Sequence, residues 1–217
     1  MSFVRFSFFK GTPPQLDGAV ELIRERIDPS FRTQAGYLGT VVVIDRESGQ
    51  GMAGTYWQTA AQLSAAEEMG VAARGEATER AGIQLTDVDR FERIFGDRLG
   101  ASRPGPGFIR ITEFRGSPDK TDAVVALTQE KLVPLLRSQA GYRATAMAVN
   151  RTTGRLLASS IWETAADREA SEHIPSDLRQ QAAQLAGAAS FRVIRAELVL
   201  TTLTPAALEV GVTTRTA

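Results

Sequence analysis

Two short stretches of this sequence each occur twice, at one fixed spacing. RTQAGY at Arg32–Tyr37 returns as RSQAGY at Arg137–Tyr142, and TYWQTAA at Thr55–Ala61 returns as SIWETAA at Ser160–Ala166. Both recurrences lie 105 residues apart, and this offset aligns Val4–Gly96 with Ile109–Thr201 without a gap, with 31 identities over 93 positions. Self-similarity at a fixed register is typical of a duplicated structural unit. The 217 residues are therefore predicted to hold two copies of one fold.

Each copy predicts a strand, a helix, a β-hairpin, a second helix and a final strand. Alternating aromatic and β-branched residues indicate a first strand at 3–9 and at 108–114. Thr12-Pro13 and Ser117-Pro118 are typical helix starts, and Gly36 and Gly141 are placed to end that helix. The remaining elements are expected at 38–45 and 52–57 for the first hairpin, at 59–82 for the second helix of the first copy, and at 88–95 and 193–200 for the last strands. The second helix is expected to kink or break at Gly70 or Pro175.

This order predicts an α+β fold of two tandem ferredoxin-like βαββαβ repeats. Helices cover only one face of such a sheet, so a second, identical sheet is expected to bury the other face. The chain would then form an intramolecular dimeric α/β barrel, an internal pseudo-dimer whose further oligomerisation the sequence leaves open. The expected boundaries are repeat 1 at 1–98, a Gly- and Pro-containing linker at 99–107, repeat 2 at 108–203 and a tail at 204–217.

Composition argues against several classes of function. Lys and Arg number 25, as do Asp and Glu, and this balance argues against binding to nucleic acid or to an acidic membrane surface. The chain has no cysteine, and His173 is its only histidine, so thiolate and multi-histidine metal centres are not expected. No signal peptide or membrane-spanning run is recognisable, and we expect a cytoplasmic protein.

The chain resembles the antibiotic-biosynthesis-monooxygenase-like family of dimeric α/β-barrel proteins. The resemblance lies in Gly36-Tyr37 and Gly141-Tyr142, in Trp57 and Trp162 followed by Thr-Ala-Ala, and in the Ala-rich helix after each Trp. It covers nearly the whole chain and implies the fold described above. Similar proteins include cofactor-free monooxygenases and haem-degrading oxygenases, so the resemblance leaves the activity open.

Four aromatic residues are candidate ligand contacts. The resemblance implies that Trp57 and Trp162 line a cavity between sheet and helices, although burial in the core explains a Trp equally well. Tyr37 and Tyr142 follow the helix stops and are expected either to offer a hydroxyl to that cavity or to pack against the helix end.

Four arginines are candidate anchors for an anionic ligand. They are Arg5 and Arg110 on the first strands and Arg90 and Arg195 on the last strands, which are neighbours in a ferredoxin-like sheet. Glu92 and Glu197 lie two residues after Arg90 and Arg195 and point to the same face, so a structural ion pair is the alternative. Arg74 and Arg179 on the second helix are expected to be solvated.

The residues that the related enzymes use are largely missing. Ser7 and Thr112 stand where the resemblance implies the Asn of haem-degrading relatives, and the strand positions before each Trp also lack Asn. His173 is expected to be exposed, and haem binding through it, as in chlorite-dismutase-like proteins, is the less favoured alternative. We therefore expect neither a cofactor nor a metal, and we can assign no catalytic residue.

The leading hypothesis is a small-molecule-binding protein with one cavity in each repeat. If the protein is an enzyme, the resemblance implies cofactor-independent oxygenation of an aromatic or polyketide-like substrate that forms its own carbanion, with arginine stabilising the charge. The alternative is a non-enzymatic structural or interaction protein. A cavity that reaches Trp57 and is lined by unpaired arginine favours the first hypothesis, whereas a filled interior with every arginine paired to Glu favours the second.

Overall fold

The chain folds into the expected βαββαβ pattern twice. The structure, a computed structural model, describes residues 1–99, 105–173, 175–205, 207 and 212–213. The strands are β1 (Ser2–Lys10), β2 (Tyr37–Asp45), β3 (Gln50–Trp57), β4 (Gln84–Arg98), β5 (Gly107–Arg115), β6 (Tyr142–Asn150), β7 (Arg155–Trp162), β8 (Phe191–Thr201) and the short β9 (Val212–Thr213). The helical elements of the first repeat are α1 (Pro13–Leu22), the π-helical η1 (Ile23–Ile27), α2 (Asp28–Phe31), α3 (Ala60–Ala65) and α4 (Glu67–Ala81). Those of the second repeat are η2 (Pro118–Lys120), α5 (Thr121–Leu127), the π-helical η3 (Thr128–Leu132), α6 (Val133–Arg137), α7 (Ala165–Ala170) and α8 (Pro175–Ala186).

Two compact units share the ends of the long strands. Unit 1 comprises residues 1–91, 104–106 and 196–210, and unit 2 comprises residues 92–103, 107–195 and 211–217. Strand β4 therefore begins in unit 1 and ends in unit 2, and β8 does the reverse. Each unit thus completes its sheet with the end of a strand from the other repeat, which the repeat boundaries alone do not indicate.

The strand pairings confirm the predicted fold class. Within unit 1, β1 and β2 both pair antiparallel with β3, and β2 also pairs antiparallel with the end of β8, with Val42 opposite Leu200. Within unit 2, β5 and β6 pair with β7, and β6 pairs with the end of β4, with Met147 opposite Phe95. Together with the pairings β1–β4 and β5–β8, the eight long strands form a closed cycle of neighbours, which is the strand topology of a dimeric α/β barrel.

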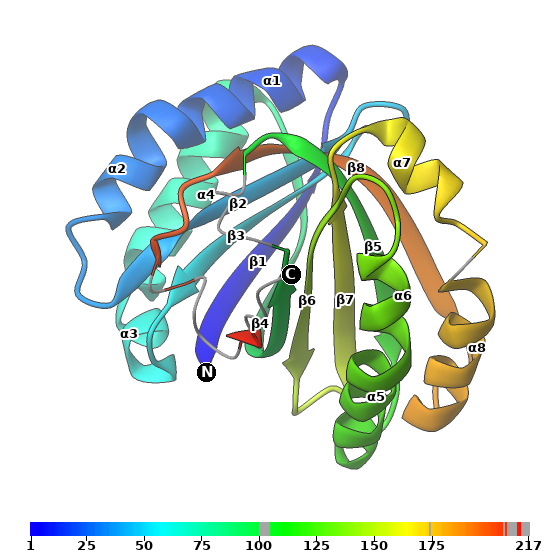
Figure 1. Cartoon of the computed structure of the whole chain (residues 1–217). Helices are drawn as coiled ribbons and strands as arrows, with labels where there is room; N and C mark the ends of the chain where they lie inside the picture. Colours follow the sequence, from blue (N-terminus) through cyan, green and yellow to red (C-terminus); the bar gives the residue numbers. More distant parts are fainter. Residues whose placement is uncertain (100–104, 174, 206, 208–211, 214–217) are drawn as a thin grey trace. The chain divides into compact units, whose positions relative to one another are not determined.

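The first helix of each repeat contains a π-helical turn at an equivalent place. In unit 1, α1, η1 and α2 form one continuous helix along the β1–β3 sheet, with α4 beside it (Figure 1). Pro29 and Pro134 lie just after η1 and η3, and both fall at the same position of the repeat. Proline has no N–H and its ring clashes with the carbonyl four residues earlier, so the helix widens there instead of continuing as a regular α-helix.

Gly36 and Gly141 do not end this helix, which ends at Phe31 and at Arg137; the glycines lie in the turn that leads to the next strand. Their φ angles are 77° and 70°, in the left-handed region that favours glycine. Steric crowding also requires glycine at these two positions. A Cβ at Gly36 would lie 2.1 Å from the Gln62 side chain, and one at Gly141 would lie 2.2 Å from Asp167 Oδ2. Strand β2 or β6 begins directly after the glycine.

The second helix breaks at a different residue from the one expected in the first repeat. The break lies at Ala66, between α3 and α4, and Gly70 lies inside α4. In the second repeat α8 begins at Pro175, in agreement with the prediction. The need for glycine at position 70 is instead steric, because a Cβ there would lie 2.7 Å from Arg5 Nη1. The glycine makes room for a guanidinium group.

Part of the predicted tail is attached. Thr204 N donates to Leu38 O at 2.8 Å, Ala207 is buried, and β9 pairs in parallel with β4 at Gly96 and Asp97. Residues 208–211 and 214–217 of the tail and 100–104 of the linker lie outside the described residues. The division into repeats at 98 and 108 stays a prediction.

Candidate functional site

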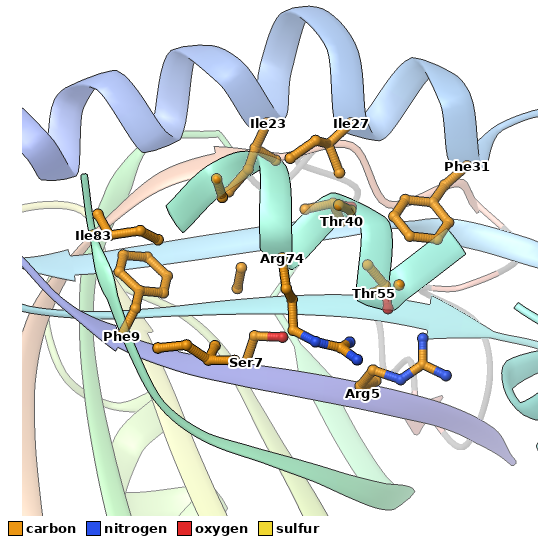
Figure 2. Close-up of a pocket in the computed structure, with 15 residues that line it drawn as sticks. Arg5, Ser7, Phe9, Ile23, Ile27, Phe31, Thr40, Thr55, Arg74 and Ile83 are labelled. Carbon is orange, nitrogen blue, oxygen red and sulfur yellow. The ribbon is translucent and has the colours of Figure 1, made fainter. Parts of the chain in front are cut away.

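Each unit contains a cavity, partly open to solvent, between its helices and its sheet. The cavity of unit 1 has a volume of about 60 Å³ and lies among η1, α2, α4 and strands β1–β3. Figure 2 shows Ile23, Ile27 and Phe31 pointing from the first helix toward the sheet, with Arg5 and Arg74 at one end. The cavity of unit 2 has a volume of about 40 Å³. Space of this size holds several water molecules or a compact ligand group.

The two cavities are built from equivalent residues. Twelve pairs of lining residues are related by the 105-residue offset: Arg5 and Arg110, Ser7 and Thr112, Phe9 and Phe114, Ile23 and Thr128, Ile27 and Leu132, Phe31 and Leu136, Thr40 and Thr145, Ala53 and Ala158, Thr55 and Ser160, Ala73 and Leu178, Arg74 and Arg179, and Ala77 and Ala182. The π-helical turns therefore face the cavities in both units. The duplicated feature is a small lined cavity beside the packed core of each unit.

Arg5 is the most deeply buried cation of the first cavity. Its side chain is 2% exposed, and its Nη2 donates to Leu63 O at 2.7 Å and to Glu67 Oε2 at 2.8 Å. Its Nε and Nη1 have no hydrogen-bond partner among the described residues. Burial lowers the pKa of Arg5 below its ordinary value of 12.5, and the negative charge of Glu67 partly offsets this. A buried donor without a partner is costly, so Arg5 is suited to a ligand that accepts hydrogen bonds.

Three arginines surround Glu67. Besides Arg5, Arg74 Nη2 donates to Glu67 Oε1 at 2.8 Å and Arg90 Nη2 donates to Glu67 Oε2 at 2.6 Å. Desolvation raises the pKa of Glu67. The hydrogen bonds from Arg74 and Arg90 and the charge of Arg5 lower it by more, so the pKa lies below its ordinary value of 4.5. One carboxylate and three guanidinium groups leave a net positive charge at this end of the cavity.

Unit 2 repeats this cluster around Glu172. Arg110 Nε lies 2.9 Å from Glu172 Oε2, and Arg110 Nη2 donates to Arg168 O and, at 3.1 Å, to Ser171 Oγ. Arg179 Nη2 donates to Glu172 Oε1, and Arg195 Nη2 lies 3.3 Å from the same oxygen. Arg110 Nη1 and the Nε and Nη1 atoms of Arg179 have no hydrogen-bond partner in the described part of the chain.

Two expectations about the arginines are wrong. Arg90 and Arg195 do not pair with Glu92 and Glu197: Glu92 binds Arg151 at 2.6 Å and Glu197 binds Arg46 at 3.3 Å. The start of α4 brings Glu67, and the turn after α7 brings Glu172, close enough to replace them. Arg74 and Arg179 are not solvated either, because their side chains are 15% and 10% exposed and line the cavities.

The two tryptophans are fully buried beside the cavities. Trp57 and Trp162 are 0% exposed, and neither is among the residues that line the cavities. Trp57 Nε1 donates to Thr55 Oγ1 at 3.2 Å, and Trp162 Nε1 donates to Ser160 Oγ at 3.0 Å. The resemblance implies that the tryptophans line the cavities, but the residues that do so are Thr55 and Ser160, whose hydroxyl groups the indoles contact.

Tyr37 and Tyr142 are also set back behind cavity-lining hydroxyls. Tyr37 Oη donates to Asp28 Oδ1 at 2.6 Å and contacts Thr40 Oγ1. Tyr142 Oη lies 3.0 Å from Asp97 Oδ2 and 2.9 Å from Thr145 Oγ1. Thr40 and Thr145 line the cavities, whereas the tyrosines reach them only through these threonines.

The described residues contain no group of three or more His, Asp or Glu side chains arranged to hold a metal ion. His173 is exposed and does not line the cavity of unit 2. Among the described helices, none combines the length and the apolar character that a membrane crossing requires.

Several site residues were missed from the sequence although a signal for them exists. Glu67 and Glu172, like Thr40 and Thr145, are identical at the 105-residue offset. Asp28 and Asp97 carry no such signal, because their equivalents are Val133 and Thr202. Only the folded chain shows that both aspartates bind the repeated tyrosine.

Comparison with known proteins gives relatives of low sequence identity. No protein-family model matches the chain. An uncharacterised protein of Mycobacterium tuberculosis, from strains CDC 1551 and H37Rv, is 24% identical over 149 residues, which is 69% of this chain and 66% of the relative. The chain thus matches just under two thirds of the length of this curated relative.

Solved structures match over nearly the whole chain. An anthrone oxidase-like protein has a TM-score of 0.69 at 16% identity, covering 95% of both chains. A ferredoxin-fold protein of Listeria monocytogenes related to antibiotic biosynthesis monooxygenases has a TM-score of 0.54 at 9% identity, covering 92% of this chain and 96% of that one. Chlorite dismutase from Candidatus Nitrospira defluvii has a TM-score of 0.58 at 10% identity, covering 92% and 91%. The fold is that of the antibiotic-biosynthesis-monooxygenase-like α/β barrels, as the sequence predicted.

Proposed function

We propose that this chain, with its monooxygenase-like α/β-barrel fold, binds a small anionic molecule in the cavity of each unit. The observation that carries the proposal is the state of Arg5. Its guanidinium group is almost fully buried and lines the cavity, and two of its three nitrogens have no partner among the described residues. Arg110 is likewise buried in unit 2 and lines its cavity, but its Nε lies 2.9 Å from Glu172 Oε2, so only Nη1 lacks a partner among the described residues.

The charge of the cluster supports an anion over a neutral ligand. Glu67 offsets one of the three surrounding arginines, and the remaining positive charge lies partly away from water. Removing an unpaired charge from water is expensive, and a bound anion restores the lost interactions. The planar guanidinium group also matches a carboxylate or a pair of enolate and hydroxyl oxygens in a bidentate manner.

The cavity walls narrow the class of ligand. Phe9, Ile23, Ile27 and Phe31 supply apolar surface opposite the arginines. Such a wall takes the hydrocarbon part of an organic anion and keeps water from its charged end. With a volume of about 60 Å³, the cavity fits a compact anion or the ionised end of a larger ring system that enters past the partly exposed Leu85.

If the protein is an enzyme, the chemistry we propose is cofactor-independent oxygenation. The fold shared with an anthrone oxidase-like protein supports this class. A substrate with an acidic CH₂ group next to a carbonyl would ionise to an enolate, whose oxygen Arg5 or Arg110 would stabilise. Reaction with O₂ would then convert CH₂ to C=O and release water. A non-enzymatic interaction protein is the alternative. The pairing of all four candidate arginines with Glu67 or Glu172 favours it, as does the absence of Trp57 from the cavity lining. The Nε and Nη1 atoms of Arg5, which lack a hydrogen-bond partner among the described residues, favour ligand binding.

Calorimetric titration with acetate and benzoate tests the binding proposal. We expect binding by the parent protein and at least about tenfold weaker binding in the combined variant Arg5→Met, Arg110→Met. Met approximates the length of the Arg stem, and Glu67 and Glu172 each keep two other arginines as partners. Removing a buried ion-pair partner can still cost about 3–5 kcal/mol, so cooperative urea unfolding must first show that the variant is folded. Arg46→Met is the control, because Arg46 pairs with Asp17 and Glu197 away from the cavity.

Gly70→Ala provides a second variant that leaves every charge in place. The added Cβ would lie 2.7 Å from Arg5 Nη1 and 3.1 Å from Arg74 Nη1, so the guanidinium groups must move. We expect weaker binding of benzoate in unit 1. Unchanged binding in all of these variants, or no binding of either acid by the parent, would refute the proposal.

A further inference from the structure

Four of the hydroxyl groups that line the cavities have donor and acceptor directions that their partners fix. A Thr or Ser hydroxyl has one proton, so a proton committed to a neighbour leaves only lone pairs for a ligand. Thr40 and Thr55 line the cavity of unit 1, and Thr145 and Ser160 line that of unit 2. The partners of these four groups show which of them still has a proton to donate.

The proton of Thr40 is committed to Tyr37. Asp28 is buried and its Oδ2 lies 2.7 Å from Arg32 Nη2, so it is a carboxylate that only accepts. Tyr37 therefore donates its single proton to Asp28 Oδ1, at 2.6 Å, and its oxygen must accept the proton of Thr40. Burial, reinforced by the hydrogen bond to Asp28, raises the pKa of Tyr37 well above 10.0, so the phenol keeps its proton.

Thr145 is committed in the same way although its carboxylate comes from elsewhere. Asp97 on β4 binds Arg137 Nε at 3.0 Å and takes the proton of Tyr142, because a charged acceptor outcompetes a hydroxyl. Tyr142 Oη is placed to donate either to Asp97 Oδ2 or to Thr145 Oγ1, 2.9 Å away; because its one proton goes to the carboxylate, the proton shared by the two hydroxyls is that of Thr145. The carboxylate has thus moved from α2 in unit 1 to β4 in unit 2, yet the threonine is held with the same direction in both.

Thr55 and Ser160 have the opposite direction. Each accepts a hydrogen bond from the buried indole of Trp57 or Trp162. Their own protons are not committed to any partner that the described residues provide. Among these four groups, Thr55 and Ser160 therefore offer donors and Thr40 and Thr145 offer acceptors. In unit 2, Thr128 and Ser159 also line the cavity with their protons committed to backbone carbonyls. Ser7 and Thr112 add hydroxyls whose direction is fixed by no partner among the described residues.

We propose that the ligand is an anion that also carries a hydroxyl group, with the anionic oxygens bound by Arg5 or Arg110 and the hydroxyl proton donated to Thr40 or Thr145. This inference rests on the proposed function and names its ligand class as hydroxy-carboxylates and hydroxylated phenolates. Thr40 and Thr145 determine specificity. Tyr37, Asp28 and their counterparts Tyr142 and Asp97 are positioning residues, because they act on the ligand only through the threonine.

The test compares hydroxy acids with their methyl ethers, which accept but cannot donate. The probes are glycolate, 3-hydroxypropionate and 4-hydroxybenzoate, each beside its O-methyl ether, titrated by calorimetry into the full-length protein. At least one hydroxy acid should bind about tenfold more tightly than its ether, which is the net value of one hydrogen bond in a buried site. The Arg46→Met control should keep this preference.

Two pairs of variants distinguish the hydrogen-bond direction of the threonines from the shape of the cavity. Thr40→Val with Thr145→Val removes the acceptor at nearly constant volume, and the preference for the hydroxy acid should disappear. Tyr37→Phe with Tyr142→Phe leaves both threonines in place but frees their protons, so the preference should shrink to less than about twofold or reverse in favour of the ether. A purely structural role for the tyrosines would weaken both probes equally. Cooperative urea unfolding verifies folding, and the single-site variants, which alter one cavity each, replace any pair that does not fold.

The outcomes distinguish this inference from the function on which it rests. If no carboxylate binds the parent protein, or if Arg5→Met with Arg110→Met leaves binding unchanged, the proposed function fails and the inference fails with it. If carboxylates bind through the arginines but the hydroxy acids show no preference, the inference alone is refuted. It is equally refuted by a preference that survives Thr40→Val with Thr145→Val, or that keeps its size in the Phe variants.

Discussion

Arg90 Nη2 on β4 donates to Glu67 Oε2 on α4 at 2.6 Å, across 23 residues of sequence. The same oxygen accepts from Arg5 at 2.8 Å, so Glu67 joins a half-exposed cation to a buried one. Arg90 therefore lies at the outer edge of the cluster and Arg5 at its inner end. This difference in exposure assigns them different energetic roles.

Arg90→Ala and Arg195→Ala should each lower the free energy of unfolding by less than about 1 kcal/mol. Their side chains are 52% and 42% exposed, and ion pairs in contact with solvent are screened and contribute little. Urea unfolding followed by the fluorescence of the two buried tryptophans measures this. A loss of about 3 kcal/mol or more would show instead that these arginines belong to a fully desolvated network.

Glu67→Gln should flatten the dependence of stability on pH in the acid range. Arg74, Arg90 and Arg5 outweigh the desolvation of Glu67 and hold its pKa below 4.5 in the folded chain. A depressed carboxyl pKa stabilises the folded state above pH 4.5, and this stabilisation is lost as the pH falls through the folded value. Urea midpoints between pH 6 and pH 3 should therefore fall less steeply in the variant than in the parent. Glu47→Gln, at an exposed hairpin position, is the control and should follow the parent curve.

The aspartate that binds Tyr37 should be movable from α2 to the end of β8. Asp28→Val leaves the hydroxyls of Tyr37 and Thr202 without their acceptor and should cost about 1–3 kcal/mol. Adding Thr202→Asp recreates the arrangement of unit 2, where Val133 and Asp97 occupy the equivalent positions.

The double variant should recover at least half of the loss, whereas Thr202→Asp alone should destabilise because it brings two carboxylates together. Free energies from urea unfolding of the three variants complete the cycle. Strictly additive losses would show that the two aspartates do not play the same part.

Hemin should bind weakly or not at all. His173 is exposed and is not among the residues that line the cavity of unit 2, and Ser7 and Thr112 replace the Asn implied for haem-degrading relatives. Absorbance titration should give no sharp Soret band at submicromolar hemin. Tight binding that disappears in His173→Ala would restore the haem hypothesis.

The sequence by itself determined the fold because its evidence is periodic and repeated. Alternation at 3–9 predicts β1, Thr12-Pro13 predicts the start of the first helix, Gly36 marks the turn before β2, and the offset of 105 residues checks each assignment twice. These signals are local, since strand alternation, helix capping and positive φ depend on a few neighbouring residues. The same repeat singled out Arg5 and Arg110, which the structure places at the cavities.

Only the tertiary structure decided which charges meet. The sequence suggested Glu92 for Arg90 because residues two apart on a strand share a face, but α4 brings Glu67 closer from 23 positions away. Likewise, Asp28 and Asp97 have no common place in the repeat, and they are comparable only because each folded unit brings one carboxylate to its tyrosine. A side chain's partner is set by the path of the whole chain, so neither local pattern nor internal symmetry could assign it.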